Sequence, residues 1–328
     1  MTAAYHEEGF LTHKRRAKLT TFFFLLPAMA FLIVYSYISF ILTLGLSFFK
    51  VDWLSRPEFV GLANFVKVTH YDLFWKSIWN ISLYVVETVG FGLVAGLLFA
   101  SLMEQKVKGL GFFRVAYFMP LVISAAATAW IFRLLFSEGF GLVPLTIQNV
   151  TSWISNLAVT WGGLHLEIGK LFFSKPVSLK FLGDPKWAMT SVAIMTMWGG
   201  LGYWILIYTA GLRSIDPELY ESAMIDGAGY WRRTVHITIP LLRHVILFLS
   251  ITGIIRAFQL FAIIMIIPPY GSSPGAPDDS TQVPILLIYN IAFGQMDFGY
   301  ASALAAVIFV ILVVLTAVQA WMGRLTQA

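Results

Sequence analysis

Two charged side chains lie deep inside otherwise apolar stretches of this sequence. Glu87 is the only charge in the run 77–103, and Arg256 is the only charge in the run 245–267. An ionisable group in hydrocarbon is costly, so such residues are candidates for a functional site. Arg256 could hold a carboxylate or phosphate through two parallel hydrogen bonds, or it could simply neutralise Glu87. The sequence leaves both interpretations open.

A cluster of polar residues, ESAMIDGAGYWRRTVHITIP at 221–240, separates two long apolar runs. The preceding Asp-Pro-Glu at 216–218 is typical of a helix start, because Asp caps free N–H groups and Pro fits the first helical position. Gly227 and Gly229 predict the end of this helix and a sharp turn, and a second short helix is expected from about Tyr230. Two short helices at an angle indicate a surface on which another protein docks.

The composition is that of a protein dissolved in lipid. Hydrophobic residues make up 58% of the 328 residues and charged residues only 12%, whereas soluble domains carry about a quarter charged residues. Cysteine is absent, which excludes disulfides, a thiol nucleophile and cysteine-based metal sites. Six apolar stretches are long enough to cross about 30 Å of hydrocarbon, so we predict an all-α integral membrane protein with six transmembrane helices. The expected spans are 19–49, 77–103, 115–136, 187–212, 245–267 and 298–323.

The distribution of basic residues orients these spans. With the N-terminus inside, the inner segments carry twelve Lys and Arg, and the longer outer segments carry eight, in agreement with the positive-inside rule. Both termini are therefore expected in the cytoplasm, as a segment 1–18 and a tail 324–328. An extracytoplasmic cap is expected at 137–186 and a cytoplasmic loop at 213–243. The net charge of +5 thus orients helices and offers no nucleic-acid surface.

The first span begins like a secretory signal. HKRRAK precedes LTTFFFLLPAMA, in which Ala28-Met29-Ala30 imitates a cleavage site. The apolar run nevertheless continues to Phe49, where a mature secreted protein would turn polar, so we expect a retained membrane anchor.

The segment DPELYESAMIDGAGYWRRTVHITIPLL resembles the EAA loop of binding-protein-dependent ABC importer permeases, in the form typical of the larger permease of maltose transporters. Three further segments are similar to the same family: FVGLANFVKV before the second span, the third span itself, and FGQMDFGYASALAAV at the start of the sixth span. The resemblance therefore covers most of the chain. Ser222 replaces the second Ala of the motif, and Ile239 the usual Leu. IPPYGSSPGAPDD replaces the usual Thr-x-Gly-Gly-Pro, and the cap is longer than in the simplest members. The resemblance implies the six-helix type I ABC importer permease fold.

The resemblance also implies a mechanism. The loop would insert into a cleft of a cytosolic ATPase, whose closure rocks the spans between inward- and outward-facing states. The chain has no Gly-x4-Gly-Lys-Ser/Thr phosphate loop, so a partner ATPase would use the ATP and Mg, and we expect no cofactor, metal or catalytic residue in this chain. The implied partners are a second homologous permease, two ATP-binding subunits, an extracytoplasmic solute-binding protein and a sugar or oligosaccharide, in a bacterial or archaeal cell membrane. The implied coupling residues are Glu221, Ser222, Ala223, Asp226, Gly227, Ile237 and Pro240.

Solute contacts are implied on the helices before and after the loop. Glycines permit close approach and an aromatic ring can lie against a sugar face, although the small residues of WGGLGYW could equally serve helix packing. Gly92 and Gly96 are expected to serve packing only. The implied pathway residues are Thr196, Gly199, Gly200, Tyr203, Gly253, Arg256 and Leu260, with Glu87 added for its intramembrane charge.

The class of solute stays open at this point. If Arg256 is not paired with Glu87, an acidic solute such as a uronate-containing, alginate-like oligosaccharide is favoured over a neutral sugar. An amino-acid, peptide or glycerol-phosphate permease is an alternative, and so is a secondary transporter, against which the docking loop argues. An intramembrane enzyme would need a catalytic set within the spans, where the sequence has neither a Ser-His pair nor paired Asp residues.

Overall fold

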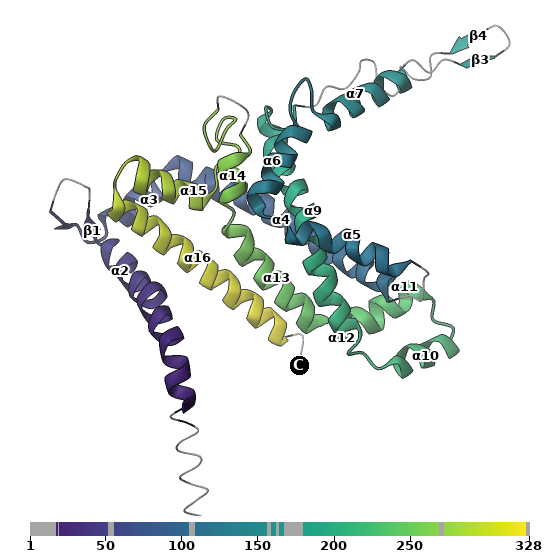
Figure 1. Cartoon of the computed structure of the whole chain (residues 1–328), viewed down its shortest axis with the longest axis horizontal. Helices are drawn as coiled ribbons and strands as arrows, with labels where there is room; N and C mark the ends of the chain where they lie inside the picture. The colour runs from purple at the N-terminus through teal and green to yellow at the C-terminus, as the bar shows by residue number, and fades with distance from the viewer. Residues whose placement is uncertain are drawn as a thin grey trace, which may run out of the picture. The chain divides into compact units, whose positions relative to one another are not determined.

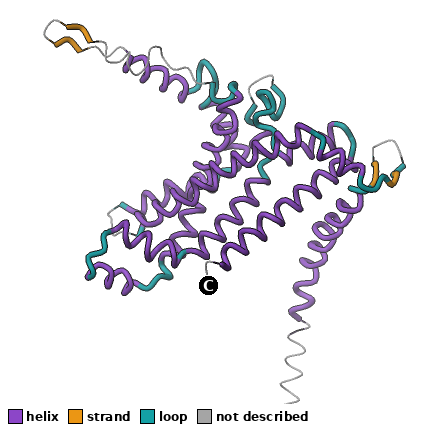
Figure 2. The backbone as a smooth tube through the Cα atoms, turned by 180° about the vertical axis from the view of Figure 1, so that it is seen from behind, coloured by secondary structure: helices purple, strands orange, loops and turns teal. Residues whose placement is uncertain are grey.

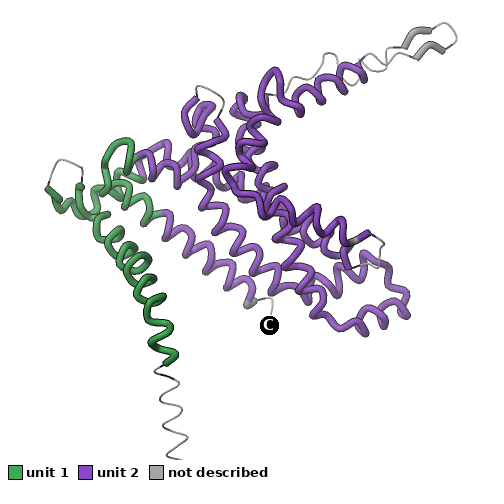
Figure 3. The backbone as a smooth tube through the Cα atoms, viewed as in Figure 1, with its two compact units in different colours: residues 1–68, 291–307 green, residues 69–290, 308–328 purple. Residues whose placement is uncertain are grey.

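The computed structural model describes residues 18, 20–51, 56–104, 109–155, 159–161, 164–166, 180–268 and 272–325. Most of these residues are helical, and the strands among them form two short hairpins (Figures 1 and 2). Residues 1–17, residues 326–328 and much of the expected cap between 156 and 179 lie outside the described residues. The chain forms two compact units, one of residues 1–68 and 291–307 and the other of residues 69–290 and 308–328 (Figure 3).

Five helices of the described chain are long and apolar enough to cross a membrane, and a bent pair of helices adds a sixth candidate span. The five are Thr20–Leu46, Asp72–Met103, Pro185–Leu212, Arg243–Ile266 and Phe298–Gly323. Each begins and ends within five residues of its expected position. The predicted all-α membrane protein is confirmed.

The third span differs from the prediction of one continuous helix over 115–136. It consists of α5 (Leu110–Val122) and α6 (Ala125–Leu135), which are bent by 101° with respect to each other. Pro120 has no N–H to extend the helical hydrogen bonding, and Ile123 is extended. Ser124 then caps α6 by accepting a hydrogen bond from the Ala127 N–H at 3.2 Å. A proline and a capping serine close together therefore break this apolar stretch.

The larger unit is built around α4 (Asp72–Met103) and α9 (Pro185–Leu212), the most extensively packed pair of helices in the described chain. A third helix, α13 (Arg243–Phe258), packs against both. The Trp204 side chain occupies the space that a Cβ on Gly92 or Gly96 would need, so these glycines let the helices approach closely. The packing role expected for Gly92 and Gly96 is confirmed.

The remaining elements of the larger unit are shorter. They are α7 (Leu142–Ser155), β3 (Val159–Trp161) and β4 (Leu164–Leu166) of the expected cap, then α14 (Ala262–Ile266) and α15 (Pro284–Tyr289). Arg133 of α6 donates a hydrogen bond from Nη1 to the carbonyl oxygen of Ile266 at 2.9 Å. Arg133 thus serves the end of α14, where backbone carbonyls lack helical partners.

The smaller unit brings together two sequence segments that are far apart in the chain. Its elements are η1 (Ile33–Ile38), α2 (Ser39–Leu46), β1 (Phe49–Lys50), β2 (Glu58–Phe59), most of α3 (Ala63–Thr69), most of η3 (Asn290–Gly294) and the start of α16 (Phe298–Leu325). Asn64 donates to the carbonyl oxygens of Ser47 and Phe49. Lys67 lies 3.4 Å from Asp297 and 3.9 Å from the centre of the Tyr300 ring. These contacts join the segment FVGLANFVKV, residues 59–68, to the segment FGQMDFGYASALAAV, residues 293–307.

Candidate coupling surface and solute site

The polar segment between the fourth and fifth spans folds into two short helices. The first, α10 (Pro217–Ile225), begins as expected, because the Asp216 carboxylate accepts a hydrogen bond from the Glu218 N–H at 3.0 Å. The turn after it contains Gly227, whose φ of +76° is a conformation that favours glycine. Gly229 has an ordinary φ of −67°. Of the two glycines that were expected to make the turn, Gly227 alone has a backbone conformation that calls for glycine.

The second short helix leads back toward the membrane. It consists of α11 (Tyr230–Arg233), a π-helical turn η2 (Thr234–Thr238) and α12 (Ile239–Leu241), which ends directly before α13. The Tyr220 hydroxyl and the Thr238 hydroxyl share a hydrogen bond of 3.0 Å. This bond ties α10 to η2, so the two short helices hold a defined position relative to each other.

The outer surface of α10 combines apolar side chains with acids. Ile225 is 88% exposed and Met224 is 51% exposed, although large apolar residues are normally buried. Most of the predicted coupling residues are exposed, namely Glu221, Ser222, Asp226, Gly227 and Pro240, while Ala223 and Ile237 are half-buried. An apolar tip flanked by carboxylates is a surface suited to insertion into a cleft of another protein.

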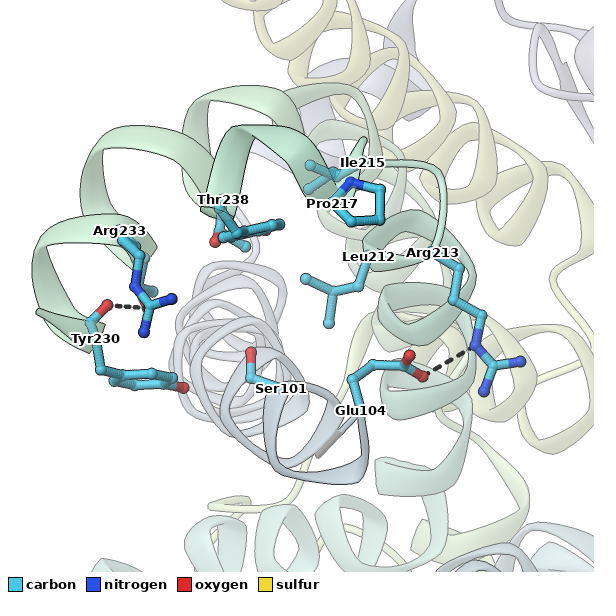
Figure 4. A pocket seen from close by; sticks show the side chains of 11 residues that line it. Ser101, Glu104, Leu212, Arg213, Ile215, Pro217, Tyr230, Arg233 and Thr238 are labelled. Atoms are coloured by element: carbon cyan, nitrogen blue, oxygen red, sulfur yellow. Dashed lines mark hydrogen bonds and ion pairs between the residues drawn. The ribbon is translucent and has the colours of Figure 1, made fainter. Parts of the chain in front are cut away.

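A pocket of about 660 Å³ lies on the other side of α10 (Figure 4). Its walls come from the inner ends of α4 and α9, the start of α10, and α11 with η2. Glu104 and Arg213 form an ion pair on its wall, with 3.0 Å between the Glu104 carboxylate and Arg213 Nε. Figure 4 shows the Arg233 side chain directed into the pocket from the opposite wall. This pocket was not predictable from the sequence, because its walls come from four separate segments.

The intramembrane arginine lies against an aromatic ring. The guanidinium carbon of Arg256 on α13 is 4.0 Å from the centre of the Tyr203 ring on α9, within the range of a cation–π interaction. Both residues line a cavity of about 140 Å³. Thr196, Gly200 and Gly253 of the predicted pathway line the same cavity. The structure therefore brings five of the eight predicted pathway residues to one site.

The remaining three predicted residues are placed differently. Glu87 accepts a hydrogen bond from the Thr190 hydroxyl at 2.7 Å through Oε1, and among the described residues no ion pair joins it to Arg256. Leu260 is 7% exposed and does not line the cavity. Gly199 also lies outside the cavity lining. The described residues thus show no ion pair between Glu87 and Arg256, and the role of Arg256 in solute binding stays a prediction.

The glycines of WGGLGYW have two different roles. A Cβ at Gly199 or Gly200 would meet open space, whereas one at Gly202 would meet the Tyr117 carbonyl oxygen at 2.5 Å. Gly253 resembles Gly202, because a Cβ there would lie 2.9 Å from Trp204. Gly202 and Gly253 thus serve helix packing, and Gly199 and Gly200 leave free space beside α9.

Tyr84 and Trp204 are among the residues of the cavity that sequence reasoning missed. Tyr84 lines it and donates a hydrogen bond from its hydroxyl to Thr196 Oγ1 at 2.9 Å. Trp204 lines it as well. Trp204 stands within WGGLGYW and could have been singled out there, whereas Tyr84 has no signal of its own in the apolar run of the second span.

Comparison with known proteins identifies the family. A model of the binding-protein-dependent transport system inner membrane component matches residues 92–327. A probable ABC transporter permease of Bacillus subtilis is 31% identical over 307 residues, which cover 92% of this chain and 95% of that protein. The lactose transport system permease of Rhizobium radiobacter is 30% identical over 313 residues, which cover 95% of this chain and 96% of that one.

A solved structure agrees with this result. The bacterial alginate ABC transporter, in complex with alginate pentasaccharide-bound periplasmic protein, contains a chain that superposes with a TM-score of 0.75. The match is 22% identical and covers 96% of this chain and 98% of that one, which shows a shared fold. The predicted fold is thereby confirmed, and the family match together with the apolar helices confirms the multi-pass membrane location. The chain belongs to the family of inner membrane components of binding-protein-dependent transport systems.

Proposed function

We propose that this chain is the permease subunit of an ABC importer that moves a sugar or oligosaccharide into the cell by alternating access. The family supports a binding-protein-dependent transporter, and the lactose permease relative supports a sugar. The sequence has no phosphate loop of its own, so ATP and Mg are used by a partner ATPase. Two ATP-binding subunits, a second homologous permease and an extracytoplasmic binding protein complete the transporter.

Coupling to ATP hydrolysis runs through α10. Its exposed residues Met224 and Ile225 form the apolar tip, and Glu221 and Asp226 supply carboxylates beside it. The Tyr220–Thr238 hydrogen bond passes a displacement of α10 to η2, which leads through α12 into α13. Since α13 carries Arg256, closure of the ATPases reaches the solute site along one continuous segment.

We further propose that the transported sugar has a negative charge, and the environment of Arg256 is the observation that supports this. Arg256 lies on the Tyr203 ring, is exposed, and has no carboxylate partner among the described residues. A guanidinium at membrane depth needs a counter-charge. An acidic sugar supplies one through two parallel hydrogen bonds to Arg256, while its ring lies against Tyr203. The alginate transporter with the same fold is a precedent for such a solute.

The test is a screen of stimulated ATP hydrolysis. The chain is purified with its partner subunits and binding protein, and ATPase activity is measured with uronate oligosaccharides and with neutral oligosaccharides of equal length. We expect stimulation by the acidic series and little by lactose. Stimulation by lactose alone would overturn the acidic sugar and leave the sugar permease standing. Stimulation only by glycerol phosphate, a peptide or an amino acid would overturn the sugar, and vanadate-insensitive transport would overturn the ATP-driven mechanism.

A further inference from the structure

The pocket beside α10 is unusual in its balance of charge. Arg213 and Glu104 form an ion pair of 3.0 Å and therefore cancel. The Arg233 side chain makes no hydrogen bond or ion pair with any described residue, and its Nε is buried. A buried donor without an acceptor is unfavourable, and a guanidinium can only donate. Among the described residues that line this space of about 660 Å³, Arg233 thus supplies one uncompensated positive charge.

The other lining residues indicate what kind of molecule fits. Ser101 and Tyr230 supply hydroxyl groups, and Leu212, Ile215 and Pro217 supply apolar surface. Figure 4 shows Arg233 and the Glu104–Arg213 pair on opposite sides of this space. An anionic oxygen satisfies the guanidinium, and a phosphate has the most suitable geometry because it can accept two parallel hydrogen bonds.

The location of the pocket also favours a phosphate ligand. The pocket lies at the ends of α4 and α9, which the distribution of Lys and Arg places at the cytoplasmic face. Trp231, directly before Arg232, is 67% exposed, as is common at the level of the lipid headgroups. Anionic headgroups concentrate at this face.

We propose that this pocket binds a phosphate group through Arg233, from an anionic phospholipid headgroup or from a soluble phosphate. Because α10 and η2 form two of its walls, a bound phosphate stabilises the position of α10. The binding site follows from the pocket alone, whereas its effect on coupling rests on the function proposed for α10.

Binding is measured first, without turnover. The full chain with its partner subunits is titrated with phosphatidylglycerol, with phosphatidylcholine and with inorganic phosphate, and bound molecules are counted by native mass spectrometry. The variants are Arg233→Gln, Arg233→Lys and, as a matched control, the exposed neighbour Arg232→Gln. We expect Arg233→Gln to weaken binding roughly ten- to a hundredfold, the scale of a charge-assisted hydrogen bond. Arg233→Lys retains part of the affinity, and Arg232→Gln changes it by less than about threefold.

The competition between ligands identifies the source of the phosphate. Preference for phosphatidylglycerol that an excess of inorganic phosphate does not displace supports the lipid. Saturable binding of inorganic phosphate that Arg233→Gln abolishes supports the soluble ligand. Binding that is equal in the parent chain, in Arg233→Gln and in Ser101→Leu, which fills the pocket from another wall, overturns the site.

Stimulated ATP hydrolysis is then compared between the parent chain and Arg233→Gln. If phosphate binding is lost while stimulation is unchanged, the effect on α10 is overturned and the site stands. If both chains show no stimulation by any sugar, the proposed transport function fails, and the binding result is unaffected.

Discussion

The guanidinium of Arg256 lies 4.0 Å from the centre of the Tyr203 ring, and so one residue of α13 is held against one residue of α9 across a small cavity. A guanidinium that stacks on a ring keeps its edge N–H groups free to donate. The ring thus orients the charge without neutralising it. This arrangement separates Arg256 from an ordinary buried ion pair and is the basis of the first two predictions.

Arg256→Ala should weaken the apparent affinity for an acidic sugar by roughly ten- to a hundredfold, because charge-assisted hydrogen bonds are lost. Arg256→Lys should retain only part of the affinity for the acidic sugar, since Lys keeps the positive charge but lacks the planar guanidinium. Uptake of labelled sugar into proteoliposomes measures the apparent affinity of both variants. The reduced, neutral form of the same sugar is the control, and an equal loss for both sugars would contradict recognition of charge.

A double variant tests whether Glu87 is the counter-charge of Arg256. Glu87 accepts a hydrogen bond from Thr190 and does not pair with Arg256, so Glu87→Gln should assemble normally. Combining it with Arg256→Ala should give the transport defect of Arg256→Ala alone, because the two sites are independent. Yield of the assembled complex and uptake are the measurements. Poor assembly of each single variant, with recovery in the double variant, would restore the ion-pair interpretation and remove the solute role.

Gly92 should respond to substitution by Ala in the opposite way to Gly199 and Gly200. Gly92→Ala places a Cβ against the Trp204 indole and should destabilise the protein by about 1–3 kcal/mol through overpacking. Gly199→Ala and Gly200→Ala meet open space, so they should keep or slightly raise stability, as Ala is the better helix former. Thermal unfolding of the purified complex measures this.

Transport by the Gly199→Ala and Gly200→Ala variants then tests whether Gly200 contacts the solute. Gly200 lines the cavity with Tyr203, so Gly200→Ala should slow uptake of a large oligosaccharide more than that of a monosaccharide. Gly199 lies outside the cavity lining, and Gly199→Ala serves as the matched control. Equal uptake of both sugars by both variants would argue against a solute contact at Gly200.

The elements were largely predictable from sequence, because span length and charge asymmetry are local properties. The break at Ile123 was not, since hydropathy does not register that Pro120 and Ser124 end one helix and begin another. The helix start at Asp216 was predictable, because its capping bond is local.

The site was predictable only in part, for a related reason. The resemblance to a family placed Tyr203 and Arg256 in the pathway, but it could not show whether Arg256 faces Glu87 or a ring. That choice depends on how α4, α9 and α13 are rotated relative to one another. The different roles of Gly200 and Gly202 depend on the same rotations, because the two residues are neighbours in one sequence motif.

The last prediction concerns the turn after α10, where two glycines offer a matched pair. Gly227 has a φ of +76° and Gly229 a φ of −67°, and neither has an atom within 4 Å of an added Cβ. Gly227→Ala therefore strains the backbone by about 1–2 kcal/mol without a clash, whereas Gly229→Ala causes neither strain nor clash. If α10 couples the spans to the ATPase, Gly227→Ala should lower solute-stimulated ATP hydrolysis severalfold and Gly227→Val should abolish it. Gly229→Ala should leave it near the parent level.

Gly227→Asn and Glu221→Lys complete this test. Asn tolerates the left-handed conformation, so Gly227→Asn should retain most of the stimulation that Gly227→Val loses. Glu221 is exposed on α10, and Glu221→Lys should lose stimulation through charge reversal at the docking surface. All five variants should reach the membrane in equal amounts, because the substituted positions lie outside the spans, and quantitative immunoblotting checks this. Stimulation that persists in both Gly227→Val and Glu221→Lys would show that the ATPase docks elsewhere on the chain.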